Sequence, residues 1–85
     1  LDAADSAGIL IKSAGTQYAS ISDSSSDLVI SSTNGMNLNF NGGTTKNKIN
    51  LTDNLADALN ITQAGNSYIK FDTTNSSENI ILFII

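Results

Sequence analysis

The chain has 85 residues, a formal net charge of −4, and no Cys, His, Pro or Trp. The lack of Cys and His excludes disulfides, thiolate or histidine nucleophiles and the usual zinc sites. Lys is the only basic residue type and acidic residues outnumber it, so we expect neither nucleic-acid binding nor attraction to an acidic lipid surface.

Self-association is the expected source of stability for so short a chain. A domain of this size buries only about 60–65% of the surface that its unfolded form exposes. Small folds usually gain support from disulfides, a structural metal or association with other copies, and the composition leaves the last of these. Asn, Ser and Thr are abundant, but the frequent Ile argues against disorder and for a β protein with a polar surface.

The pattern over residues 9–32 predicts three strands. An apolar stretch precedes the AGT sequence at residues 14–16, which has the composition of a three-residue hairpin loop with Gly in the left-handed conformation. A strand that holds Tyr18 follows. A longer polar connection at residues 23–27 then leads to a partly apolar strand at residues 28–32.

The middle of the chain contains its clearest alternation. Residues 36–41 read MNLNFN, so Met36, Leu38 and Phe40 share one face of a predicted half-buried strand and Asn residues occupy the other. Turn signals made of Asn and Gly flank this stretch on both sides. Residues 48–52, KINLT, continue the alternation and predict a further strand.

The next part of the chain begins with its one segment of helical potential. Residues 53–59, DNLADAL, predict one or two helical turns at most. The AGN sequence at residues 64–66 repeats the hairpin signal, and the strand predicted at residues 68–72 places Ile69 and Phe71 on one face. In all we expect about eight short strands joined by tight turns, an all-β fold.

The sequence ends in six consecutive apolar residues that require cover on both faces. Alternation places Ile80, Leu82 and Ile84 on one face and Ile81, Phe83 and Ile85 on the other. The run is far shorter than the roughly twenty residues that cross a bilayer as a helix, so we expect no membrane insertion. A single sheet has no second layer, so identical neighbouring chains or further chain must supply the cover.

An imperfect repeat appears when the sequence is laid on itself at an offset of fifty residues. Each unit consists of a strand, an AG turn, a strand with Tyr, a polar loop and an apolar strand. We therefore predict a first repeat at residues 1–50 and a second, incomplete repeat at residues 51–85, within an excerpt of a longer chain. The matching pairs are Leu1 with Leu51, Ile11 with Ile61, Ala14 with Ala64, Gly15 with Gly65, Tyr18 with Tyr68, Ser26 with Ser76 and Ile30 with Ile80, with the conservative pairs Ile9 with Leu59 and Ile21 with Phe71 between them.

No residue pattern predicts catalysis, a cofactor or a bound metal, and we expect no enzyme. Ser67 and Lys70 match the S-x-x-K spelling of serine acyl-enzymes, but positions i and i+3 of a strand point to opposite faces. The Asp pairs in residues 23–27 and 53–57 lack the ligand number and spacing of calcium loops, so solvated loops are the better interpretation. An ion held between three copies of one Asp on a fibre axis stays an alternative.

Tyr18 and Tyr68 occupy equivalent positions in the two predicted repeats. One interpretation is a surface aromatic that stacks on a sugar. The other, which we favour, is a repeated packing or inter-chain position whose hydroxyl reaches solvent, because residues equivalent in a repeat usually serve the repeat.

Residues 58–82, ALNITQAGNSYIKFDTTNSSENIIL, resemble a segment that recurs in structural proteins of tailed bacteriophages, especially tail fibres and other virion fibres. Residues 9–30 resemble a degenerate copy that carries SDSSSD in place of DTTN. The resemblance implies an intertwined, trimeric β-fibre, similar to a β-prism or β-helix, in which three chains wrap a shared apolar axis. It implies no catalytic residues.

The expected function is a non-enzymatic structural component of a virion fibre, either a tail fibre or a capsid-attached fibre. A homotrimer would form a rigid shaft or connector, in contact with other virion proteins and, during host attachment, with a glycan or protein of the host cell surface. The residues predicted to mediate self-association are Met36, Leu38, Phe40, Ile69, Phe71, Ile80, Ile81, Leu82, Phe83, Ile84 and Ile85. The alternatives are a bacterial surface adhesin or extracellular filament subunit, and, third, a fragment of a glycan-cleaving tailspike.

Overall fold

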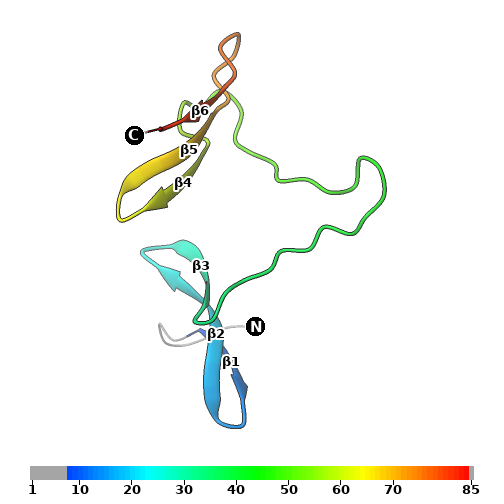
Figure 1. Ribbon diagram of the computed structural model, residues 1–85, viewed down its shortest axis with the longest axis vertical. Coiled ribbons are helices and arrows are strands. Elements are labelled where there is room, and N and C mark those ends of the chain that lie inside the picture. The colour runs from blue at the N-terminus through cyan, green and yellow to red at the C-terminus, as the bar shows by residue number, and fades with distance from the viewer. Residues whose placement is uncertain (1–7, 85) are drawn as a thin grey trace. The chain divides into compact units, whose positions relative to one another are not determined.

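The computed structural model describes residues 8–84, and these form two three-stranded antiparallel sheets without a helix. The expected all-β fold is therefore confirmed. Figure 1 shows the strands, which are β1 (Ile9–Ser13), β2 (Thr16–Ser24), β3 (Asp27–Ser32), β4 (Leu59–Gln63), β5 (Asn66–Asp72) and β6 (Asn79–Leu82). Contacts divide the chain into two units, Leu1–Phe40 and Asn41–Ile85, and each unit holds one sheet. The boundary at residue 50 comes from the repeat offset, not from contacts, and stays a prediction.

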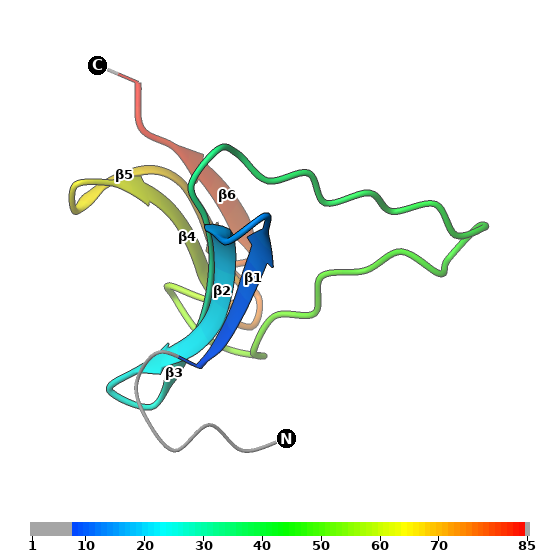
Figure 2. The ribbon, with the colours of Figure 1, turned by 90° about the horizontal axis from the view of Figure 1, so that it is seen from below.

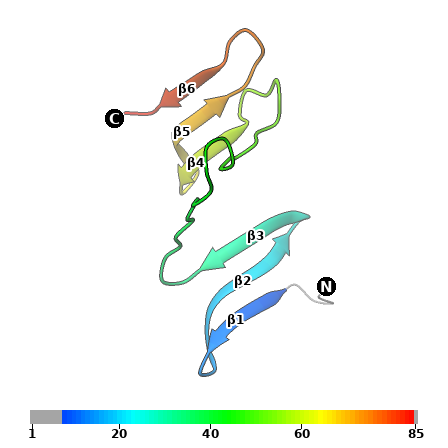
Figure 3. The ribbon, with the colours of Figure 1, turned by 90° about the vertical axis from the view of Figure 1, so that its right-hand side faces the viewer.

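Each sheet is a meander in which consecutive strands are neighbours. The strand order is β1-β2-β3 in the first sheet and β4-β5-β6 in the second, as Figure 3 shows. The hairpins β1–β2 and β4–β5 turn through Ala14–Gly15 and Ala64–Gly65. All four of these residues have positive φ, between 49° and 82°, which is the geometry of a type I′ turn. The hairpin loops therefore contain two residues, and the three-residue loops expected from the sequence are wrong.

A β-bulge follows both hairpin turns. Ile11 pairs with Ala19 and Lys12 with Gln17, so Tyr18 has no partner across the ladder. The register of β4 and β5 shifts in the same way and leaves Tyr68 unpaired. The Tyr18 carbonyl oxygen accepts a hydrogen bond from the Thr33 N–H at 2.9 Å, and that of Tyr68 accepts one from Phe83 at 3.0 Å. A bulge strengthens the local right-handed twist of its strand, and both sheets carry it at the same place.

Three predictions for the chain segment between β3 and β4 are wrong. Residues 36–41 and 48–52 form no strand, and residues 53–59 form turns, with Leu59 opening β4, where helical turns were expected. In Figure 2 the chain after β3 carries no strand arrow until β4 begins. Alternation identifies residues suited to an extended, half-buried backbone, but a strand also needs a neighbour to pair with. Residues 53–59 form no helix, and backbone groups of Asn54, Leu55 and Ala58 instead bond to Phe71 in β5 and to Thr73 just after it.

The polar connection at residues 23–27 is shorter than expected. β2 and β3 pair as far as Ser24 with Asp27, so only Ser25 and Ser26 turn, with φ of 50° and 74°. The terminal apolar run is also only partly in a strand, since β6 ends at Leu82. Ile85, which the sequence places in that run, lies outside the described residues, as does Leu1 of the repeat comparison.

Candidate self-association surface

Within residues 8–84 no side chain, apolar or polar, is buried. Each unit holds a single sheet, so no second layer of the same unit covers an apolar face.

The second sheet gathers its apolar side chains on one face. Across the three strands Leu59 pairs with Phe71, which pairs with Ile80, and Ile61 pairs with Ile69, which pairs with Leu82. Because alternate residues of a strand share a face, these two rows lie on the same side of the sheet. Ile61, Ile80 and Leu82 are 48%, 60% and 60% exposed. We call the six residues of these rows the second apolar face.

The first sheet repeats this face at equivalent positions. Ile9, Ile21 and Ile30 form one row across its strands, and Ile11, Ala19 and Ser32 form the next. We call these six residues the first apolar face; it is the less apolar of the two, because Ala19 and Ser32 stand where the second sheet has Ile69 and Leu82.

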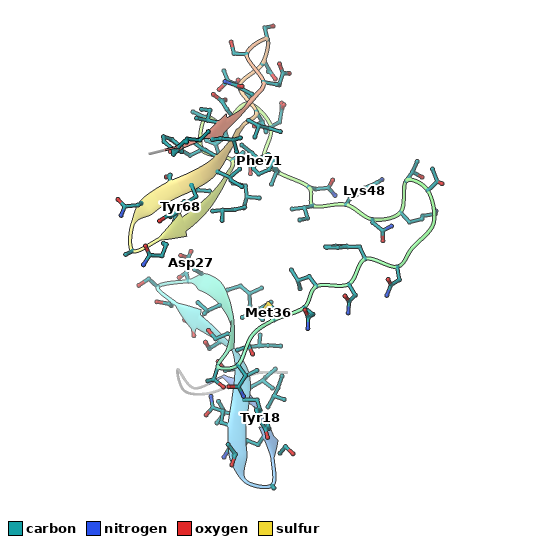
Figure 4. All side chains as sticks on the ribbon, in the orientation of Figure 1. Tyr18, Asp27, Met36, Lys48, Tyr68 and Phe71 are labelled. Atoms are coloured by element: carbon teal, nitrogen blue, oxygen red, sulfur yellow. The ribbon has the colours of Figure 1, made fainter. Side chains whose placement is uncertain are left out.

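The opposite side of the second sheet carries charge. Lys70 Nζ lies 2.8 Å from an Asp57 carboxylate oxygen and 5.7 Å from the centre of the Phe83 ring. Tyr68 and Phe83 line a hollow beside Lys70, and Figure 4 shows Tyr68 on β5. This side combines aromatic rings with an ion pair, whereas the second apolar face has no charged residue.

A segment that we call the strap, residues 52–58, runs back along the end of β5. Thr73 holds it, because the Thr73 hydroxyl donates to the Thr52 carbonyl at 2.5 Å and accepts the Leu55 N–H at 3.1 Å. The backbones of Thr73 and Leu55 also bond at 3.0 Å, and the Ala58 N–H donates to the Phe71 carbonyl at 3.0 Å. These bonds account for the absence of a helix in this segment.

Asp72 at the end of β5 is tied to the turn that follows. The Thr74 N–H donates to the Asp72 carboxylate at 2.9 Å. Hydrogen bonds from the Thr74 side chain and backbone hold the pKa of the Asp72 carboxyl below its ordinary value of 3.8, and the charge of Lys70 adds to this. The ionised carboxylate therefore favours the folded turn.

The structure brings some of the expected self-association residues together and separates others. Ile69, Phe71, Ile80 and Leu82 meet on the second apolar face, whereas Ile81 and Phe83 belong to its opposite side. The other predicted self-association residues within residues 8–84 are exposed and lie outside the strands: Met36, Leu38, Phe40 and Ile84. Figure 4 labels Met36 on the chain after β3.

Sequence reasoning missed Leu59 and Ile61 in the second apolar face and all of the first apolar face. The pairs Ile9 with Leu59 and Ile11 with Ile61 were visible at the fifty-residue offset, so the repeat held the missing signal. Strand pairing was needed to turn that signal into a surface.

Within residues 8–84 the structure does not assemble a recognisable catalytic or metal-binding arrangement. No group of three or more acidic side chains that could hold a metal ion occurs within residues 8–84. Ser67 and Lys70 both lie in β5, where the Lys70 ammonium is engaged by Asp57. In the part of the chain that the structure describes, no helix has the length and hydropathy required to cross a bilayer.

Comparison with known proteins identifies no relative. No protein-family model, no curated protein and no solved structure matches the chain.

Proposed function

We propose that the chain is a structural component of a phage virion fibre, a tail fibre or a capsid-attached fibre, that acts as a rigid shaft or connector. Identical chains associate through apolar side chains as an intertwined trimer, similar to a β-prism or β-helix. The fibre is a non-enzymatic part of the virion, joined to other virion proteins and positioned for attachment to a glycan or protein on the host surface.

The observation that carries the proposal is the absence of any buried side chain in residues 8–84. Complete burial of a large apolar side chain contributes about 1.5–3 kcal/mol. The second apolar face has six such side chains, three of them 48–60% exposed and three less exposed, so covering it would contribute roughly 3–7 kcal/mol. The first apolar face has four, between 36% and 57% exposed, and covering it would contribute roughly 3–5 kcal/mol. This is comparable with the entire stability of a small domain. A chain that leaves so much stabilisation unused as a monomer is suited to assembly.

The equivalence of the two sheets supports a chain built from repeats of about fifty residues. The AG turn, the bulge at Tyr and the pairing of the three strands recur at an offset of fifty positions. Repeats that stack along a chain form elongated structures, which suits a fibre.

The segment of residues 36–41 supports pairing between chains. It keeps the apolar alternation of a strand, yet it has no ladder partner within residues 8–84. Met36, Leu38 and Phe40 are 49%, 70% and 52% exposed. In a trimer the same segment of the neighbouring chains supplies both the pairing and the cover.

Immunogold electron microscopy tests the virion assignment. Antibody raised against the 85-residue chain is applied to phage particles and to cells from cultures that produce the protein. We expect gold on fibres of the particles. Gold on the bacterial surface with unlabelled particles would instead favour a surface adhesin or filament subunit and would overturn the virion assignment.

A further inference from the structure

We propose that the first and the second apolar face are both homotypic contact surfaces, and that each face packs against the same face of two further copies aligned in parallel. This inference rests on the proposed self-association but names the surface that performs it. The opposite side of each sheet faces solvent, so Ile81 and Phe83 do not contribute, whereas Leu59 and Ile61 do.

The apolar face occurs at matched positions in the two sheets. The rows Ile9–Ile21–Ile30 and Leu59–Phe71–Ile80 correspond residue by residue at the fifty-residue offset. A second copy aligned in parallel presents the same two faces in the same order along its chain, so each face can meet its own equivalent.

The area of a single apolar face is small compared with that of a stable interface. Three strands about 4.8 Å apart and five residues of about 3.3 Å each give a face of roughly 14 by 17 Å, or about 240 Å² in projection. A stable interface takes about 800 Å² of accessible surface from each partner. One face meeting one copy is too small. The two faces together offer about 480 Å² in projection, so a stable assembly needs both faces rather than one.

The two sides of the second sheet differ in their chemistry. Each side that enters an interface loses its water. The six residues of the second apolar face carry no charge, and the two carboxylates that border it, Asp72 and Glu78, lie at one end, in the hollow that Phe71 and Ile80 also line. Burial of the opposite side would desolvate the Lys70–Asp57 pair in the middle of the sheet, which is unfavourable without new partners. Only one side of the sheet is therefore suited to a dry homotypic contact.

Light scattering of the 85-residue chain over a range of concentrations provides the first test. We expect trimers that dissociate on dilution, and an assembly at least tenfold weaker for Ile11→Asn and for Ile61→Asn. Leu10→Asn is the matched control, because Leu10 neighbours Ile11 in β1 and is 39% exposed against 49%, but lies on the opposite side of the sheet. Equal effects of Leu10→Asn and Ile11→Asn would overturn the choice of face. A compact monomer at all concentrations would overturn the inference entirely, because the two faces would then cover each other within one chain.

Thiol labelling keeps the test valid if an Asn variant fails to fold. The chain has no Cys, so Ile61→Cys and Leu10→Cys each introduce one thiol, and Cys is a small apolar residue that preserves the character of the face. We expect a maleimide to label Ile61→Cys at least tenfold more slowly at assembling than at dissociating concentrations, and Leu10→Cys at the same rate in both. A labelling rate of Ile61→Cys that does not change with concentration would contradict the inference.

The two proposals fail in different ways. Trimers with a protected Ile61→Cys thiol, from a chain that immunogold places on the bacterial surface, would keep the interface and overturn the virion assignment. Gold on virion fibres, with equal labelling of the two thiols, would keep the virion assignment and overturn the interface.

Discussion

The two sheets share a frame but differ at its ends. Both have a two-residue AG turn, a Tyr bulge and the same pairing of three strands. The first sheet continues to a two-residue turn at Ser25–Ser26, whereas the second ends its ladder at Asp72–Asn79 and is secured by the strap. The comparison teaches that the turn and the bulge set the strand frame, and that the far end of each sheet can be closed in different ways.

Gly8→Ala should give the largest effect, although the repeat alone suggests that it is harmless. Ala58 stands at the equivalent position of the second sheet. Gly8, however, has a φ of 67°, and a Cβ there would collide with the carbonyl oxygen of Ile21. We expect a loss of about 2–4 kcal/mol from the first sheet through backbone strain and overpacking. Hydrogen exchange resolved by residue measures it, and unchanged protection of β1 and β2 would contradict the prediction.

Thr73→Val should affect only the second sheet. Val matches the shape of Thr but removes the hydroxyl that bonds Thr52 and Leu55, so we expect a loss of about 1–2 kcal/mol. Exchange of the Leu55 and Ala58 amides should accelerate, with no change in β1–β3. Thr62→Val is the control, because the Thr62 side chain makes no hydrogen bond to residues 8–84. Equal acceleration in both variants would show that the strap does not depend on Thr73.

Ala14→Asn and Ala64→Asn should stabilise their own sheets by equal amounts. Ala at positive φ is strained, and Asn-Gly is the preferred pair in a type I′ turn. We expect a gain of about 0.5–1 kcal/mol for each substitution in denaturant unfolding monitored by circular dichroism. Thr16→Asn, just beyond the turn, serves as the control. A gain in one sheet only would mean that the two hairpins differ in a way that their matching φ angles do not reveal.

The smallest expected difference between the two sheets is in how their stability depends on acid pH. A carboxyl whose folded pKa is lowered contributes stability that is fully present above its unfolded pKa and is lost as the pH falls through the folded value. For Asp72 this loss begins as the pH falls below about 3.8, and Ser22 at the equivalent position of the first sheet does not titrate. Thermal unfolding between about pH 5 and 2 should show an acid limb that is shallower in Asp72→Asn. If the original chain and Asp72→Asn lost stability equally as the pH falls, Asp72 would not be the cause of the acid dependence.

The candidate self-association surface was partly predictable from the sequence. Alternation in β5 identified Ile69 and Phe71, and the repeat offset aligned Tyr18 with Tyr68. The repeat offset did not identify Tyr18 and Tyr68 as bulge residues, because a bulge depends on which residues pair across the ladder. The same alternation predicted a strand at residues 36–41 that the structure lacks, because the pattern describes the side chains and not the neighbour.

The sequence by itself determined that this is a β protein with tight turns and with no residues for histidine or thiol chemistry. These properties follow from local backbone preferences and from composition, which act over a few residues. Only the tertiary structure decided that the strands form two separate meanders, that the Leu59–Phe71–Ile80 row has a counterpart in the first sheet, and that the strap bonds to Thr73. Those features join residues far apart in the chain, and periodicity carries no information about which distant residues pair.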